Sequence, residues 1–281
     1  MALFIAVLIL VRILPTEPGV FLVRLFTLFY LAVRPDYRRE INTNYRLIFG
    51  CSRRWFWVRN GWRVGRNLAL MVKIGTKFAN KLIDRGQIYW ENRIESRVIR
   101  EKEPSFMASF HFGLWELLPQ LFVRRWGNVA VLVSEQRTRI LNLFLQRWRK
   151  SNEVSLVFQI THLLRRRSKT GITGFMLDNT SQGRQFLVEL PSPVAGDKVR
   201  FRLPTVPFQI ARYWANRSGG KEKGVVPVFG YLWRGRFVVR VFPAGDEINA
   251  LQALLTMVRK MPEEWIFWGK SGAVQEVFEV R

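Results

Sequence analysis

The chain has 281 residues, 48% of them hydrophobic, which is enough for one domain with a substantial core, or one domain plus an appendage. Its 45 Lys and Arg residues against 21 Asp and Glu give a net charge of +24, which implies an anionic partner, either nucleic acid or an anionic membrane. The single cysteine, Cys51, excludes an intrachain disulfide, and with only two histidines a closed zinc site is not expected.

The N-terminus carries two apolar runs, residues 2–14 and 20–33, separated by the breaker Pro15-Thr-Glu-Pro-Gly19. Each run reaches roughly 21 Å as a helix, whereas the hydrocarbon core of a bilayer is about 30 Å thick and needs about 20 apolar residues. We therefore predict that residues 1–33 form a membrane anchor, short or folded as a shallow helical hairpin. An ordinary buried helix is the alternative. A cleaved signal peptide is not expected, because no basic segment precedes the first run.

Residues 34–100 are basic and aromatic. Between Arg34 and Lys73 there are ten basic residues against two acidic ones, and Trp55, Trp57 and Trp62 are interleaved with arginines. Arginine with tryptophan is typical of a membrane interface, and basic residues beyond an apolar segment favour its cytoplasmic side. We predict membrane-proximal helices here; a solvated basic face with Trp in the core is the alternative.

The rest of the chain alternates two kinds of segment. Short apolar runs predict strands at 105–110, 129–133, 154–158, 174–177, 225–229 and 237–242. Helical spacing covers 140–148, 206–216 and 248–258, and residues 182–204 are expected to form a loop. The fold class is therefore α/β: a single domain, 34–281 with its catalytic core at 101–281, containing a mostly parallel mixed sheet flanked by helices. Ligands of such sheets bind at the carboxyl ends of strands.

His111 follows one of these apolar runs and precedes Phe112 and Gly113, where a strand would turn into a helix. Glu116 comes five residues later and could meet His111 only if the histidine lies on the turn and the glutamate in the first helical turn. A carboxylate bonded to one imidazole nitrogen makes the other nitrogen a better base, so the pair could take a proton from a hydroxyl. Pro119 predicts that the following helix is short or kinked.

The block His111-Phe-Gly-Leu-Trp-Glu116 resembles the His-x4-acid motif of glycerolipid acyltransferases. Its fuller spelling is similar to that of the late lipid A acyltransferases (lauroyl and myristoyl transferases) and related bacterial lysophospholipid acyltransferases. The resemblance extends in order along residues 100 to 270, with further matching blocks at 140–149, 174–179, 225–229 and 262–268. Pro262-Glu-Glu-Trp265 is close in spelling to a Pro-Glu-Gln-Trp segment of that family.

The resemblance implies that the chain is an O-acyltransferase, with His111 as the general base and Glu116 as its orienting acid. The family moves a fatty acyl chain from an acyl carrier protein or coenzyme A thioester to a lipid hydroxyl, without a metal or other cofactor. Implied partners are that donor and anionic membrane lipid, not nucleic acid, and the implied location is a bacterial inner membrane, with the active site facing the cytoplasm or its interface. Candidate substrate-binding residues are Gly113, Trp115, Arg137, Arg139, Asp178 and Arg184. A structural role for Asp178 and a solvated loop position for Arg184 are the alternatives.

The sequence departs from the family pattern after Val133. Ser134 and Glu135 stand where the family carries Tyr-Arg, so Arg137 or Arg139 would have to substitute. The acceptor therefore stays open between a lipid A precursor and a lysophospholipid. Two other hypotheses remain: an inactive membrane-surface paralogue, and a nucleic-acid-binding protein, which the charge favours but the apolar N-terminus does not.

Overall fold

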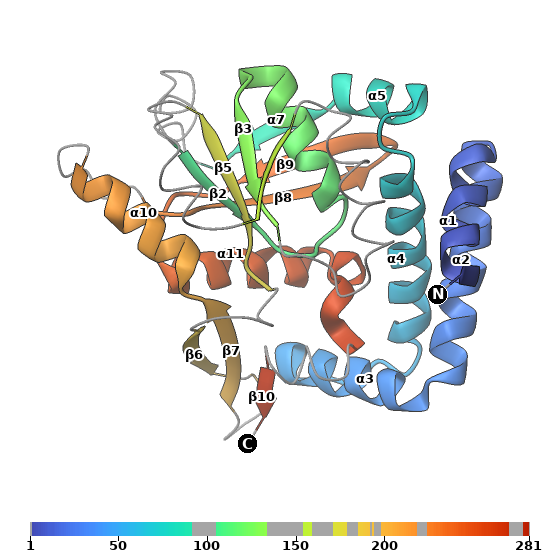
Figure 1. Cartoon of the computed structure of the whole chain (residues 1–281). Helices are drawn as coiled ribbons and strands as arrows, with labels where there is room; N and C mark the ends of the chain where they lie inside the picture. Colours follow the sequence, from blue (N-terminus) through green and yellow to red (C-terminus); the bar gives the residue numbers. More distant parts are fainter. Residues whose placement is uncertain are drawn as a thin grey trace.

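The computed structural model describes residues 2–91, 105–133, 154–158, 171–178, 185–191, 193, 198–217, 224–269 and 278–280. Its centre is a mostly parallel sheet of seven strands in the order β1-β9-β8-β2-β5-β3-β4, with helices packed on both faces (Figure 1). The predicted α/β class with a mixed, mostly parallel sheet is therefore confirmed.

The strands of this sheet are short and apolar. They are β1 (Gln87–Trp90), β2 (Ser105–Ser109), β3 (Val129–Leu132), β4 (Ser155–Val157), β5 (Ile172–Met176), β8 (Val226–Trp233) and β9 (Arg236–Val241). β8 and β9 form an antiparallel hairpin, and every other pairing in the sheet is parallel. Consequently β1 and β9 run opposite to the other five strands, and the carboxyl ends of β2, β5 and β3 share one edge.

Side chains of alternate strand residues feed two hydrophobic clusters, as the period of two along a strand requires. In β2, Phe106 and Ala108 join one cluster and Met107 joins the other. α11 (Glu247–Lys260) covers the first face, whereas α5 (Lys77–Asp84) and α7 (Leu118–Trp126) cover the second (Figure 1). α10 (Val206–Arg217) lies at the far side of the molecule from the N-terminal helices.

Four helices from the N-terminal part stand against one side of this core (Figure 1). They are α1 (Ala2–Ile13), α2 (Thr16–Val33), α3 (Pro35–Phe49) and α4 (Phe56–Val72). Close packing of α2 on α4 depends on glycines in α4: a Cβ on Gly65 would lie 2.8 Å from the Arg24 Cα, and one on Gly61 would lie 2.6 Å from a methyl group of Leu31.

Two basic side chains tie α1 to α4 by capping each other's helix. The Arg12 guanidinium donates to the carbonyls of Val72 and Ile74, both at 3.0 Å, at the end of α4. The buried Lys73 ammonium donates in return to the carbonyl of Leu14, at 2.5 Å, just beyond α1. Cations at helix C-termini satisfy carbonyls that have no partner within the helix. The α1–α2 hairpin is thus part of the folded body.

Three expectations about local structure need correction. The breaker between the apolar runs is shorter than predicted, because α2 begins at Thr16 and Pro18 lies in its first turn, where a missing N–H costs little. The expected loop 182–204 contains β6 (Gln185–Pro191) and β7 (Lys198–Pro204). β7 pairs with β6 on one side and with β10 (Phe278–Val280) on the other, in a separate antiparallel sheet. The run Gln87–Trp90 was not predicted as a strand; it alternates between faces and lies at the sheet edge.

Candidate active site

The site is built at the carboxyl ends of two neighbouring parallel strands. Ser109, the last residue of β2, pairs in register with Met176, the last residue of β5. His111 and Asp178 each follow two residues later, so the same offset from paired strands brings their side chains together. The amide of Leu177 donates to the carbonyl of Ser109 at 2.8 Å and extends the pairing as far as the site.

Asp178 holds His111 by two hydrogen bonds. His111 Nδ1 lies 2.7 Å from Asp178 Oδ1, and the backbone N–H of His111 donates to Asp178 Oδ2, also at 2.7 Å. The indole N–H of Trp265 donates to the same Oδ2 at 3.4 Å. The Asp178 side chain is fully covered, whereas 21% of the His111 side chain is exposed. With Nδ1 donating to the carboxylate, Nε2 is the nitrogen that can accept a proton.

This arrangement changes the role expected for two acidic residues. The hydrogen bond to His111 Nδ1 that we expected from Glu116 is made by Asp178. Asp178, for which the sequence left open a substrate-contacting or a structural role, has a fully covered side chain that is hydrogen-bonded to His111. Glu116 is half-buried in the short 3₁₀ helix η1 (Trp115–Leu117), directly after the His111 turn, as predicted.

The turn after His111 requires glycine. Gly113 has a φ of +61°, and a Cβ at this position would lie 2.2 Å from the carbonyl oxygen of Gly230 in β8. That carbonyl accepts the N–H of Leu114 at 2.6 Å. Gly113 therefore permits close approach of the turn to β8, which is a structural explanation for a residue expected to bind substrate.

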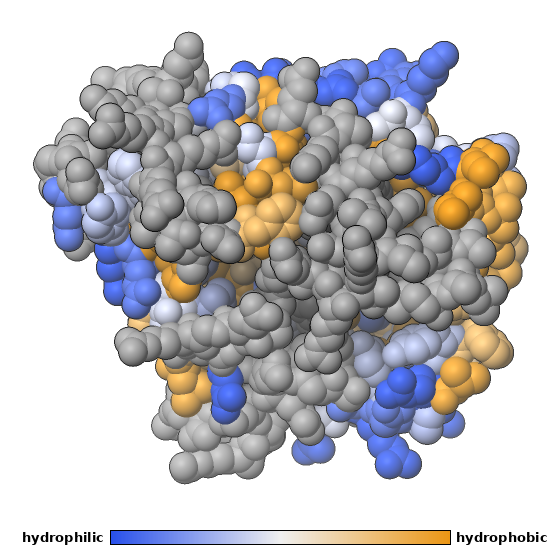
Figure 2. Space-filling model, in the orientation of Figure 1, coloured by the Kyte–Doolittle hydropathy of each residue, from blue (hydrophilic) through white to orange (hydrophobic). Residues whose placement is uncertain are grey.

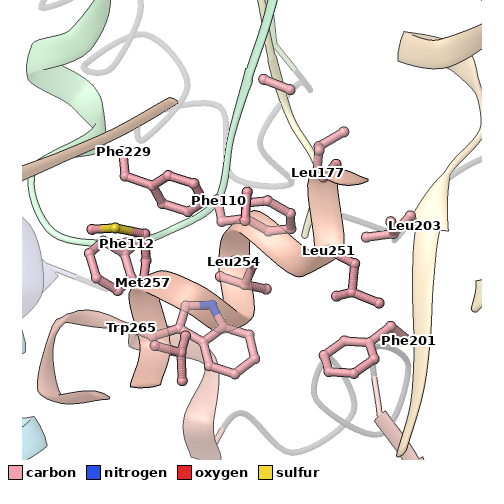
Figure 3. Close-up of a cluster of buried hydrophobic side chains, with 14 of the residues drawn as sticks. Phe110, Phe112, Leu177, Phe201, Leu203, Phe229, Leu251, Leu254, Met257 and Trp265 are labelled. Atoms are coloured by element: carbon pink, nitrogen blue, oxygen red, sulfur yellow. The ribbon is translucent and has the colours of Figure 1, made fainter. Parts of the chain in front are cut away.

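Fully buried aromatic rings fix the backbone on both sides of His111. Phe110 stacks on Phe229 with ring centres 5.8 Å apart, and Phe112 meets the same ring edge-on at 5.6 Å (Figure 3). Trp265 lies below them against α11. The His111 ring also meets Trp115 edge to face, with ring centres 5.0 Å apart. The His111 backbone is thus held between buried rings, and its side chain is bordered by the half-buried indole of Trp115.

A C-terminal segment, η2 (Pro262–Glu264) and η3 (Ile266–Gly269), is hydrogen-bonded to the His111 turn. The carbonyl of Glu264 accepts the N–H of Gly113 at 2.9 Å, and the N–H of Ile266 donates to the carbonyl of His111 at 3.0 Å. Asn60 of α4 donates to the Trp265 carbonyl at 2.9 Å, and Asn44 of α3 to the Trp268 carbonyl at 2.8 Å. The N-terminal helices therefore hold the segment that holds the histidine.

A buried ionic cluster completes this connection. The Glu264 carboxylate accepts from Asn67 at 2.6 Å and from Arg66 at 3.1 Å, both on α4. Burial raises the pKa of Glu264, although both partners oppose the shift. Burial likewise lowers the pKa of Arg66 to about 10, although Glu264 opposes that shift. Desolvation of both charges thus exceeds their attraction, as is common for buried pairs.

The remaining predictions for the site have mixed outcomes. The helix after Pro119 is short, as one of the two predicted outcomes required: α7 has nine residues and begins at Leu118, which places the proline in the first turn, where its missing N–H is tolerated. Trp115 lies beside His111 as described. Arg137, Arg139 and Arg184 lie outside the described residues, so their proposed contacts with substrate stay predictions.

Comparisons of the chain with protein-family models and with curated proteins found no match. The functional assignment therefore depends on the geometry around His111 and on the motif that contains it.

Proposed function

We propose that this chain is an O-acyltransferase that moves a fatty acyl chain from a thioester to a hydroxyl of a phospholipid or glycolipid at a membrane surface. The observation that carries the proposal is the pairing of a partly exposed histidine with a buried carboxylate at 2.7 Å. This pair lies at the carboxyl edge of a parallel sheet, where ligands of α/β proteins bind.

The chemistry follows from the tautomer that Asp178 selects. His111 Nε2 takes the proton of the acceptor hydroxyl as its oxygen attacks the thioester carbonyl. The tetrahedral intermediate collapses by breaking the carbon–sulfur bond, and the imidazolium returns the proton to the leaving thiolate. Asp178 stabilises the imidazolium that exists between these steps. A thioester is reactive enough that one positioned base, with orientation of the reactants, is a sufficient catalytic device.

The membrane side of the proposal is supported by α2. Among the described residues α2 is the one helix long and apolar enough to cross a membrane. Its outward face exposes Phe21, Leu25 and Phe29. Figure 2 shows hydrophobic residues along the edge where Figure 1 places α1 and α2. Contiguous exposed apolar surface of this kind marks a membrane or protein contact.

We infer that α2 lies in the membrane interface and does not span the bilayer. Arg24, in the middle of α2, stacks on Trp62 of α4 with its guanidinium carbon 4.6 Å from the ring centre. A spanning α2 would carry Arg24 and the packed α4 to the bilayer centre, at about 2.5–3.5 kcal/mol for each arginine. A flat orientation places the arginines among anionic headgroups, where each contributes about 1 kcal/mol of attraction. The proposed location is the cytoplasmic face of a bacterial inner membrane.

The test is acyl transfer by the full chain purified in detergent. Acyl coenzyme A and acylated acyl carrier protein are offered as donors, and a lysophospholipid and a lipid A precursor as acceptors, with products identified by mass spectrometry. We expect one donor–acceptor combination to give product, and His111→Ala to abolish it. Absence of product from every combination would overturn the proposal, and the productive acceptor decides between the two lipid classes.

The control is Asp246→Asn. Asp246 caps α11 by accepting from the amides of Ile248 and Asn249, both at 3.0 Å, and asparagine caps helices equally well. This variant should retain the full rate. An unchanged rate in His111→Ala would show that the base is elsewhere.

A further inference from the structure

A pocket of about 650 Å³ opens beside the β8–β9 hairpin, on the sheet face that α11 covers. The pocket begins where α11 ends at Lys260 and no longer shields the strands. Its lining combines the cations of Arg234, Arg236 and Lys260 with the rings of Tyr89, Tyr231 and Trp233. The catalytic pair does not use this pocket.

The charge of the pocket is uncompensated within the part of the chain that the structure describes. No acidic side chain lines it. Its other cation, Arg240, is paired with Glu91 at 2.7 Å, whereas Arg234, Arg236 and Lys260 form no ion pair with a described acidic residue. Three exposed cations around one concave surface attract an anion, and guanidinium groups fit the oxygens of a phosphate.

The aromatic residues indicate what accompanies the anion. Trp233 is 54% exposed and Tyr89 is 51% exposed, and both line the pocket. The Arg234 guanidinium lies over the Trp233 ring, with its carbon 5.9 Å from the ring centre. Rings beside cations suit a ligand that carries a planar or apolar group next to its phosphate.

The β8–β9 turn contains Arg234 at a position whose backbone conformation disfavours arginine. Arg234 has a φ of +47° and is the only non-glycine residue with positive φ among the described residues. Two-residue hairpin turns of this kind prefer asparagine or glycine at that position. A side chain held in a sparsely populated backbone region is a sign that the side chain itself is needed.

The pocket adjoins the His111 turn through two segments. Gly230, whose carbonyl accepts the N–H of Leu114, immediately precedes Tyr231 of the lining. Met261 of the lining immediately precedes the η2 segment, whose Glu264 carbonyl accepts the N–H of Gly113. Trp233 is three residues beyond Gly230, or roughly 10 Å along the strand. A ligand anchored here by its phosphate could therefore extend to the histidine.

We propose that the hairpin pocket binds the phosphate of a substrate that also carries a planar or apolar group. This inference rests on the proposed function, because it assigns the phosphate to one of the reactants. Two sources share the chemistry: the nucleotide phosphates of a coenzyme A thioester, and the phosphate of a lipid headgroup.

Binding of two probes to the purified full chain tests the proposal. Adenosine 3′,5′-bisphosphate represents the nucleotide source, and phosphatidic acid in mixed micelles represents the lipid source; affinity is measured by calorimetry. We expect one probe to bind, and Arg236→Gln and Lys260→Gln each to weaken that binding roughly tenfold or more, because each removes a charge-assisted contact. Arg259→Gln is the matched control, since it removes the same charge from the same helix end without touching the lining.

Arg234→Gly separates ligand binding from hairpin stability. Glycine relieves the positive φ, so this variant should unfold at a higher temperature while it binds the probe more weakly. A hairpin with a purely structural role would lose no affinity. Failure of both probes to bind, or an equal loss in Arg259→Gln and Arg236→Gln, would overturn the proposed pocket.

Probe binding is measured in His111→Ala as well, which keeps the outcomes for pocket and catalysis distinct. Probe binding by a wild-type chain that shows no acyl transfer in any assay supports the pocket and removes the proposed function, whereas binding that persists in His111→Ala alone is the expected result for a pocket separate from the histidine. Acyl transfer by wild type with no probe binding removes the pocket alone.

Discussion

The histidine's partner decides which of its nitrogens is basic. Asp178 has two oxygens, and each accepts from a different N–H of His111. In Asp178→Asn only one oxygen remains, and it stays with the backbone N–H, since that donor cannot change. The amide NH₂ then faces Nδ1, which must become the acceptor, and the ring proton moves to Nε2.

Asp178→Asn should therefore reduce the rate constant of acyl transfer by about 10²–10⁴-fold, with little change in apparent affinity for substrate. Steady-state kinetics on purified protein measure both quantities. Glu116→Gln is the informative comparison, because it tests the acid that the motif alone indicates. A large loss in Glu116→Gln together with a normal rate in Asp178→Asn would reverse the assignment.

Glu264 carries a prediction about pH and stability. Because burial raises its pKa in the folded chain above the ordinary value of 4.5, its contribution to stability is complete below that value. The contribution is lost as the pH rises through the folded-state pKa. Glu264→Gln cannot ionise, so its melting temperature should improve relative to wild type as the pH is raised from about 4 to about 8. If the melting temperatures of wild type and Glu264→Gln changed equally with pH across that range, the prediction would be wrong.

At the scale of elements, the His111 turn, β8 and the η2 segment form one backbone assembly. Gly113 is its tightest point, since its missing Cβ makes room for the Gly230 carbonyl. Two backbone hydrogen bonds also join the turn to η2 and η3: the N–H of Gly113 donates to the Glu264 carbonyl, and the N–H of Ile266 donates to the His111 carbonyl. Displacement of any of these elements would move the His111 backbone relative to Asp178.

Gly113→Ala should destabilise the chain by about 1–3 kcal/mol and remove most acyl transfer, because the clash and the positive φ both oppose the native turn. Gly50→Ala provides a matched control: Gly50 has a φ of +70°, but its Cβ would meet nothing closer than 3.3 Å. We expect Gly50→Ala to cost about 1–2 kcal/mol and to keep its activity. Denaturant unfolding and the rate assay measure the two effects, and equal activity in both variants would disprove a special role for the turn.

At the scale of the whole molecule, the N-terminal helices and the α/β sheet form one packed body. Arg12 and Lys73 lock the α1–α2 hairpin onto α4, and asparagines of α3 and α4 hold the segment below the histidine. An interfacial α2 would thus set the height of the active site above the lipid. This arrangement suits an enzyme whose acceptor remains in the membrane.

Phe29→Glu should weaken binding to anionic vesicles about tenfold, because 65% of the Phe29 side chain is exposed and available for insertion at about 1–2 kcal/mol. The melting temperature should stay the same, since little of the ring packs within the protein. Ile248→Glu, at a residue 48% exposed on α11, is the control and should bind normally. Vesicle sedimentation measures binding, and an equal loss in both variants would argue for general electrostatic repulsion.

Local patterns in the sequence determined much of the architecture. The apolar runs at 105–110 and 237–242 became β2 and β9, and the helical spacing at 248–258 became α11, because periodicity reports which face of an element is buried. The search for continuous apolar runs missed β6 and β7, which pair mainly with each other. In β7 (Lys198–Pro204) polar and apolar residues alternate, which is a strand pattern that such a search does not select. His111 was located correctly at the end of a strand, since that signal is also local.

The partner of His111 was decided only by tertiary structure. Glu116 is five residues away in the chain and Asp178 is 67 away, so spacing favoured the nearer acid. Asp178 reaches the histidine because β2 and β5 are neighbours in a register that pairs Ser109 with Met176. Strand order depends on how distant segments share a core, which no local pattern contains. For the same physical reason, the buried contact of Glu264 with α4, and with it the link from the N-terminal helices to the His111 turn, could be seen only in the folded chain.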